Sequence, residues 1–122
     1  YKSDLVISNA TIEHVGDFNN QNKMFKNINK LSKKIFVIIT PNRFHPIEFH
    51  TKLPLIHWLP RIIHRKILKF FQMPFYAKEE NLNLLSEKDF KNMANEINID
   101  FEFKFIRFLF FKSNLIFIGK KV

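Results

Sequence analysis

The chain has no cysteine and only two glycines in 122 residues. The absence of cysteine excludes a disulfide framework, a thiolate zinc site and a cysteine nucleophile. Neither Gly16 nor Gly119 lies in a Gly-x-Gly turn. No apolar run approaches the roughly 18 residues of a membrane-spanning helix, and the N-terminus lacks the basic-then-apolar pattern of a signal peptide. We therefore expect an intracellular protein.

Length and charge limit the architecture and the partners. A chain of 122 residues that is 46% hydrophobic can bury one modest core, so one domain or part of one is expected. The 20 Lys and Arg exceed the 11 Asp and Glu, for a net charge of +9. The cations are largely lysines spread along the chain, which favours a solvated basic surface over a nucleic-acid interface. The first residue is Tyr rather than Met, so we expect the natural chain to extend upstream.

A short apolar run near the start predicts a buried strand that leads into a functional loop. Leu5–Ile7 is apolar at consecutive positions, which is typical of a strand covered on both faces. Ser8, Asn9 and Thr11 follow it, where open α/β sheets bind their ligands.

The next segments complete a parallel unit. Asp17 is a suitable helix cap, and apolar residues recur behind it at three- and four-residue spacing, at Met24, Phe25, Ile28 and Leu31. Ile35–Ile39 is again apolar at consecutive positions and predicts a second buried strand. A strand, a helix and a strand in succession indicate two parallel strands, over residues 4–40.

Residues 41–84 are predicted to form an inserted lid, because five prolines between Pro41 and Pro74 prevent one continuous helix. Pro60 suits a first helical turn. The helix after it is expected to pack through an apolar stripe, formed by Leu59, Ile63, Ile67 and Phe70. It is also expected to carry a basic stripe, formed by Arg61, Arg65 and Lys69. From about Met73 to Leu84 we expect loop.

Residues 86–122 are predicted to form a helix and a closing hairpin. Ser86 and Asp89 resemble a capping box, and an apolar helical face follows. Apolar positions alternate from Phe101 and change parity near Ile106, which indicates a bulge. A turn at 112–114 would then join an antiparallel last strand, Leu115–Ile118.

Two runs resemble one known family. Asp-Leu-Val-Ile-Ser-Asn-Ala-Thr-Ile-Glu-His-Val, residues 4–15, is similar to the fourth strand and following loop of class I S-adenosylmethionine-dependent methyltransferases. The run Thr40–His50, with His57-Trp58-Leu59-Pro60 behind it, resembles one subgroup of these enzymes. The resemblance covers nearly the whole chain but only the second half of the family's fold. It implies an α/β architecture: the C-terminal half of a Rossmann-like methyltransferase sheet, with the last strand inserted between its neighbours.

The resemblance also implies a cofactor, S-adenosylmethionine. Asn9, Ala10 and Thr11 would lie beside its methionine part, although a turn that merely needs small residues is the alternative. Such enzymes bind the cofactor mainly through a glycine-rich turn and an acidic residue after the second strand, and this chain lacks that half of the site. Glu13 could orient the loop or cap the following helix. His14 could act as a general base, or it could be a hydrogen-bonded loop residue.

The acceptor would lie at the second strand's carboxyl end. The candidate substrate-binding residues are Asn42, Arg43, His45, His57 and Trp58. Arg43 could bind a phosphate or carboxylate. Trp58 could form an aromatic wall or pack the insertion onto the domain. His45, Glu48 and His50 suggest a metal site. Pro46, however, prevents a helix from placing these side chains on one face, and the sequence has no second cluster of ligands, so we expect no metal.

Two functions remain open at this point. The first is a methyltransferase fragment, expected to be inactive alone, whose acceptor is a small molecule, a glycan or a lipid-borne group. The second is a non-enzymatic basic module whose 59–71 helix binds a membrane surface or a partner. We expect a cytoplasmic location, with peripheral contact at the inner face of the membrane as an alternative. The sequence does not determine the oligomeric state.

Overall fold

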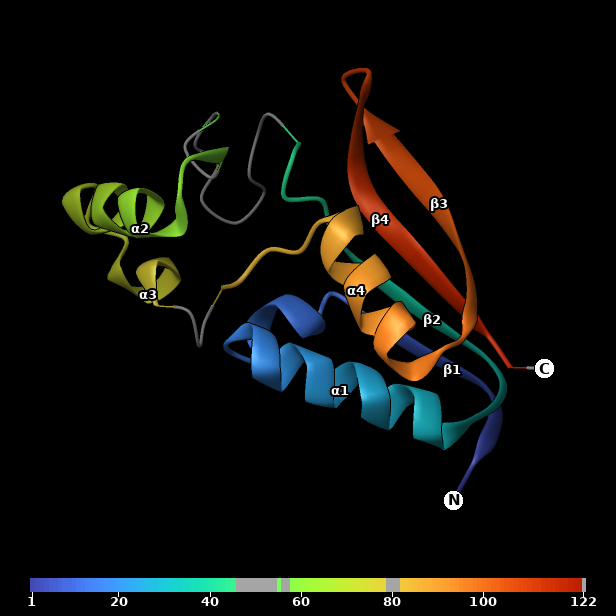
Figure 1. Ribbon diagram of the computed structural model, residues 1–122. Coiled ribbons are helices and arrows are strands. Elements are labelled where there is room, and N and C mark those ends of the chain that lie inside the picture. The colour runs from blue at the N-terminus through green and yellow to red at the C-terminus, as the bar shows by residue number, and fades with distance from the viewer. Residues whose placement is uncertain (46–54, 56–57, 79–81, 122) are drawn as a thin grey trace.

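The computed structural model describes residues 1–45, 55, 58–78 and 82–121, and within them a mixed α/β fold built on a four-stranded sheet (Figure 1). The strands are β1 (Ser3–Asn9), β2 (Ser32–Pro41), β3 (Asp100–Phe108) and β4 (Phe111–Lys120). Their order is β1-β2-β4-β3, with β1 parallel to β2 and β4 antiparallel to both neighbours. The predicted insertion of the last strand is confirmed.

Helices α1 (Phe18–Leu31) and α4 (Glu87–Ile97) cover one face of this sheet (Figure 1). Both begin at predicted caps. Asp17 accepts a hydrogen bond from the Asn20 amide at 2.9 Å, and the Asp89 carboxylate accepts from the Ser86 amide at 2.8 Å. Each bond satisfies a backbone donor that the first helical turn leaves unpaired. The two caps therefore fix where the covering helices start.

The core between these helices and the sheet is built largely from phenylalanine. The Phe117 ring on β4 lies at its centre, with ring centroids 5.2 to 5.8 Å away from those of Phe25, Phe36, Phe90, Phe101 and Phe103. Next to it, the Phe36 ring occupies the space that a Cβ atom at Gly119 would need. Gly119 is thus required for close approach of a ring to the backbone.

The opposite face of the sheet carries apolar side chains and no helix of the described residues. Leu5 is 50% exposed and Ile7 is 60% exposed, so the prediction of a strand buried on both faces was wrong for β1. Ile35 on β2 is also exposed, while Phe36 and Ile38 face the helices and are buried. The consecutive apolar residues predict two covered faces because a parallel sheet normally has them. Only one is covered here.

The insertion differs from its prediction in two places. A short helix, α3 (Pro74–Ala77), lies where loop was expected. Helix α2 (Arg61–Phe70) begins after Pro60 as predicted, but it packs through His64 and Leu68. Ile63 and Phe70, which the predicted apolar stripe placed inward, are 46% and 81% exposed. None of the described helices combines the length and apolar character that crossing a bilayer requires.

The closing hairpin turns earlier than its sequence suggested. The predicted bulge is confirmed by a register shift between Ile106 and Arg107. The turn, however, falls at Leu109 and Phe110, between the paired residues Phe108 and Phe111. Residues 112–114 belong to β4, where Ser113 donates its hydroxyl to the Ile106 carbonyl. That bond lets polar residues remain within a strand.

Candidate functional site

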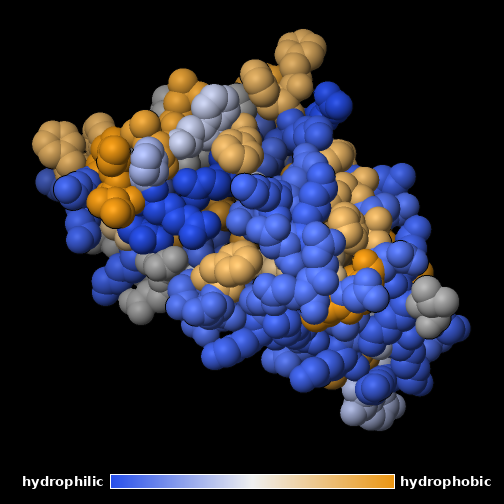
Figure 2. Space-filling view, viewed as in Figure 1, coloured by the Kyte–Doolittle hydropathy of each residue, from blue (hydrophilic) through white to orange (hydrophobic). Residues whose placement is uncertain are grey.

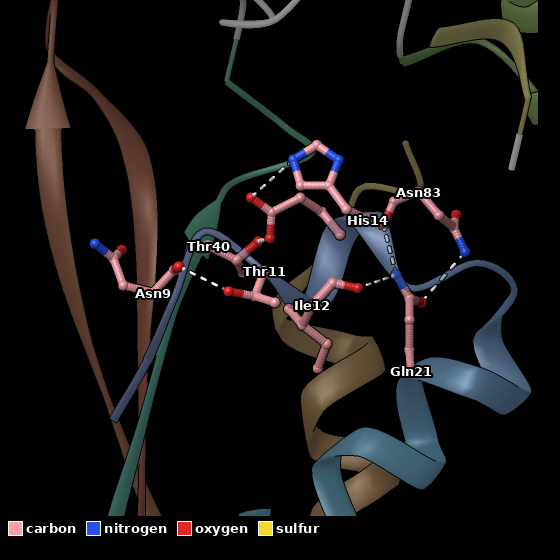
Figure 3. A network of polar contacts seen from close by, with 8 residues as sticks. Asn9, Thr11, Ile12, His14, Gln21, Thr40 and Asn83 are labelled. Atoms are coloured by element: carbon pink, nitrogen blue, oxygen red, sulfur yellow. Dashed lines mark hydrogen bonds and ion pairs between the residues drawn. The ribbon is translucent and has the colours of Figure 1, made fainter. Parts of the chain in front are cut away.

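The carboxyl ends of β1 and β2 meet at one edge of the sheet because the two strands are parallel. At the end of β1, Ala10 adopts a positive φ of 49° and donates its amide to the Ile39 carbonyl at 2.9 Å. Thr11 donates its hydroxyl to the Asn9 carbonyl at 2.9 Å (Figure 3). The Asn9 side chain is exposed and points away from the buried network. A strained, exposed backbone thus stands at this edge.

Glu13 is fully buried directly behind this loop, in the short helix η1 (Ile12–His14). Its Oε2 accepts a hydrogen bond from the Thr40 hydroxyl at 2.9 Å, which ties η1 to the end of β2. Its Oε1 accepts no hydrogen bond from any residue that the structure describes, and His14 Nε2 lies 3.9 Å from it. Of its two predicted roles, Glu13 orients the loop, because Asp17 is the residue that caps the helix.

Two amide side chains, those of Gln21 and Asn83, hold η1 and the residues that follow it through hydrogen bonds to the backbone. Gln21 on α1 donates to the carbonyls of Ile12 (3.2 Å) and Asn83 (2.7 Å). Asn83 in turn donates to the Gly16 carbonyl (3.1 Å) and to Gln21 Oε1 (3.2 Å), and its backbone amide donates to the Glu13 carbonyl (2.7 Å). Figure 3 shows these amides converging on the loop. Sequence reasoning missed both residues, because they are 62 positions apart and belong to no motif.

We expect Asn83→Ala to lower the free energy of unfolding by about 2–4 kcal/mol, because the buried Gly16 carbonyl and Gln21 Oε1 would each lose a donor. Urea denaturation measures this change. Asn27→Ala, at an exposed position of α1, is the matched control and should change stability by less than about 0.5 kcal/mol. Equal effects of the two substitutions would show that the amide network does not support the loop.

A second cluster follows β2 and is joined to the first by residues 82–86, which are all buried. The Asn42 side chain donates to the Lys112 carbonyl at 2.9 Å, and the Asn42 backbone amide donates to the Ser113 carbonyl at 2.8 Å. The Arg43 amide donates to the Leu85 carbonyl at 3.1 Å. The segment that bonds to Glu13 and Gly16 through Asn83 therefore also bonds to the loop after β2. It forms a shared wall behind both candidate loops.

Arg43 is half-buried and lies near other charged side chains. Partial burial lowers the pKa of its guanidinium, and the nearby cations Arg61 and Arg65 lower that pKa further, while Asp89 opposes them. Arg43 donates one hydrogen bond to the Leu59 carbonyl at 3.3 Å. Arg43, Arg61 and Arg65 line one small pocket together with Asn83. A concentration of guanidinium groups of this kind is suited to binding an anion.

The other predicted acceptor residues differ in exposure: His45 is buried, Trp58 is exposed, and His57 lies outside the described residues. His45 is 1% exposed, with its Nε2 3.2 Å from the Phe108 carbonyl, so it supports the hairpin rather than lining an open surface. Trp58 is 44% exposed and donates its indole N–H to the His45 carbonyl at 3.3 Å. A side chain that packs the insertion onto the domain would be less exposed than this. His57, like Glu48 and His50, lies outside the described residues.

A cavity of about 550 Å³ opens beside the Asn42 loop. Aromatic rings form one part of its lining and the start of α4 forms another; the lining residues are Asn42, Phe44, Ser86, Glu87, Lys88, Lys91, Phe111 and Lys112. Aromatic rings beside polar and charged groups are found in many small-ligand sites. Among the sequence candidates that the structure describes, Asn42 alone lines it.

No family model matches the sequence, and no curated protein matches it. Solved structures do match the fold. Magnesium protoporphyrin IX methyltransferase (ChlM) from Synechocystis PCC 6803, solved with bound SAH, superposes with a TM-score of 0.59 at 11% identity. An O-methyltransferase family protein from Burkholderia thailandensis gives 0.60 at 13% identity, and the small RNA methyltransferase HEN1 gives 0.58 at 15% identity.

The coverage of these matches is one-sided. They include 99%, 97% and 99% of this chain, but only 46%, 30% and 14% of ChlM, the Burkholderia protein and HEN1 respectively. The chain thus spans less than half the length of each. Its mixed α/β fold with a four-stranded sheet resembles that of methyltransferase structures, as the sequence predicted.

Proposed function

We propose that this chain is the acceptor-side part of an S-adenosylmethionine-dependent methyltransferase whose cofactor-binding part is a separate segment. One observation carries this proposal: β1 is a parallel edge strand with exposed Leu5 and Ile7, and its carboxyl end leads into the Asn9 loop. A parallel edge with an uncovered apolar face needs further strands and helices beside it. In an open α/β sheet, the crevice at such a position binds the ligand.

The residues of the loop suit one wall of a cofactor site. Ala10 combines a small side chain with an exposed backbone, so a ligand can approach closely there. Asn9 offers an exposed amide that can both donate and accept. The chain has no Gly-x-Gly turn for the rest of the cofactor. When bound, S-adenosylmethionine would supply an electrophilic methyl group.

A residue of η1 and residues after β2 would act on the acceptor. His14 is held beside the buried Glu13 carboxylate and could accept the proton that a hydroxyl or amine acceptor loses. Arg43, with Arg61 nearby, would hold an anionic group such as a phosphate or carboxylate. The apolar part of an acceptor would lie against Phe44 and Phe111 in the adjacent cavity. Small molecules, glycans and lipid-borne groups can all carry these features.

The proposal assigns a role to each of the three segments that the sequence predicts. Residues 4–40 supply the parallel strands and the candidate cofactor wall, and residues 86–122 supply the closing helix and hairpin. Residues 41–84 would form a lid over the acceptor. A lid has to close and open for each turnover, so it should be less stable than the sheet that carries it.

The proposal predicts that this chain alone does not bind S-adenosylmethionine saturably, because half of the site is missing. The chain expressed together with the proposed cofactor-binding segment should bind it at micromolar concentration. Isothermal titration calorimetry of both proteins measures this difference. In the longer protein, Asn9→Leu should weaken binding, whereas Asn27→Leu, at an exposed position of α1, should not.

Each contrary outcome identifies a specific error. Saturable binding by the 122-residue chain would show that the Asn9 wall suffices, and the division into two parts would be wrong. Absence of binding by the longer protein would overturn the proposed cofactor. If Asn9→Leu and Asn27→Leu behaved alike, the loop after β1 would not be part of the cofactor site.

A further inference from the structure

The tip of the β3–β4 hairpin exposes four consecutive large apolar side chains. Phe108, Leu109, Phe110 and Phe111 are 50%, 56%, 96% and 50% exposed. The hairpin extends beyond the rest of the sheet (Figure 1), and hydrophobic side chains gather at that end of the molecule (Figure 2). Isolated apolar residues on a surface are normal, but a continuous run of this kind indicates a contact surface.

The backbone of the tip is also strained. Leu109 and Phe110 form a two-residue connection and have positive φ angles of 48° and 68°. Hairpins with two central residues at positive φ strongly prefer Asn-Gly or Asp-Gly, because other side chains crowd the backbone there. Leu and Phe are therefore unfavourable for forming the turn. Their presence at the tip requires an explanation other than hairpin stability.

Basic side chains border the apolar tip. Arg107 directly precedes Phe108 and is exposed. Lys112 follows Phe111, although it is paired with Glu87 at 3.1 Å. A second exposed apolar group, Ile62, Ile63 and Phe70 on α2, is interspersed with Lys66 and Lys69. Figure 2 shows hydrophobic side chains at two places along the upper side of the molecule. Apolar tips bordered by cations suit the boundary between anionic headgroups and acyl chains.

We propose that the hairpin tip, Phe108–Phe111, inserts into the headgroup boundary of an anionic lipid bilayer. A protein partner would need a pocket that accepts a narrow convex tip, whereas a bilayer needs none. β3 is parallel to β2, because both pair antiparallel with β4. The tip therefore lies at the same edge of the sheet as the carboxyl end of β2. Docking in this way turns the candidate site towards the membrane. The proposal does not depend on the methyltransferase activity.

The test is co-sedimentation with vesicles of phosphatidylcholine alone and of phosphatidylcholine with one third phosphatidylglycerol. We expect the wild-type chain to bind the anionic vesicles and to dissociate as salt is raised. Leu109→Asn/Phe110→Gly should weaken binding by at least about tenfold, because two inserted side chains are removed. The same variant should melt at a higher temperature, because Asn-Gly fits the two positive φ angles. A folded, more stable variant separates loss of binding from loss of structure.

Matched substitutions test whether the effect is local. Leu31→Asn, at the end of α1, and Ile7→Asn, on the open sheet face, remove residues that are 49% and 60% exposed. Both should bind vesicles as the wild type does. Arg107→Gln should weaken binding to anionic vesicles by about fivefold and leave the weak binding to neutral vesicles unchanged.

Three results would overturn the proposal. The first is wild-type chain that stays in the supernatant with both kinds of vesicle. The second is a Leu109→Asn/Phe110→Gly variant that sediments as the wild type does. In the third, analytical ultracentrifugation shows a wild-type dimer that this variant loses, which would identify the tip as a self-association surface. Cofactor calorimetry is independent of all three, so a failure here leaves the proposed function untouched.

Discussion

Phe117→Ala is expected to lower the free energy of unfolding by about 3–5 kcal/mol, the range for a buried Phe replaced by Ala. The Phe117 ring is fully buried and contacts five other phenylalanine rings from α1, α4, β2 and β3. Its removal leaves a cavity that stiff neighbouring rings cannot fill. Small domains are stable by only about 5–15 kcal/mol, so this variant should be close to unfolding at room temperature.

Urea denaturation followed by circular dichroism measures this loss. Phe110→Ala is the matched control, because it removes the same side chain at a position that is 96% exposed. It should change stability by less than about 0.5 kcal/mol. A small effect at Phe117 would mean that the aromatic core is loosely packed, and the helices would then not hold the candidate site firmly.

His14→Ala is expected to lower the turnover of the complete enzyme by about a hundredfold or more, the usual contribution of general acid–base catalysis. This prediction depends on the proposed function. His14 is exposed and lies beyond the end of β1, outside the core. Its replacement should therefore shift the thermal midpoint by little. Turnover with S-adenosylmethionine and thermal denaturation should be measured on the same preparations.

A second substitution separates catalysis from loop structure. Glu13→Gln keeps the size of the buried side chain and an oxygen for the Thr40 hydroxyl, but it removes the charge beside His14. If His14 accepts a proton during turnover, both variants should be slow and should change the pH–rate profile. Turnover that is unchanged in His14→Ala would indicate an enzyme that acts by positioning its reactants. Parallel losses of turnover and thermal stability would assign His14 a structural role.

The sequence predicted the sheet well because its strongest patterns are local. The capping residues Asp17 and Ser86 mark the start of each covering helix, and the change of parity at Ile106 marks the bulge. These patterns depend on hydrogen bonds or side-chain alternation within a few residues. The order of the strands came from the family resemblance instead. The structure agrees with it, since β4 lies between β2 and β3.

The position of the hairpin turn could not be predicted, because residues typical of turns lie in the strand and apolar residues form the turn. Ser113 and Asn114 are typical turn residues, yet both lie in β4, where Asn114 pairs with Pro41 and Ile106. Leu109 and Phe110 carry no turn signal but form the turn. Register with two neighbouring strands overrides local preference at this point. A sequence pattern read along one strand does not contain that information.

The candidate site was only partly predictable for a related reason. The sequence locates the carboxyl ends of β1 and β2, and these ends share one edge of the sheet because the strands are parallel. It therefore places Asn9, His14 and Arg43 near that edge. Gln21 and Asn83, which fix the loop, are joined by tertiary contacts alone. The uncovered sheet face was also missed, since consecutive apolar residues look the same whether the second layer is present or lies elsewhere.

The position of β4 has a consequence for folding and for tolerance to change. This strand forms a short hairpin with β3 but must also pair with β2, about 70 residues earlier in the chain. Loop closure becomes harder only slowly with length, by about 0.6 kcal/mol for each doubling, so the connection between these strands can vary in length at little thermodynamic cost. One residue inserted into β4 would instead shift its register against two strands at once and reverse the facing of Phe117. Changes of length can thus accumulate between β2 and β4, whereas β4 itself tolerates no insertion.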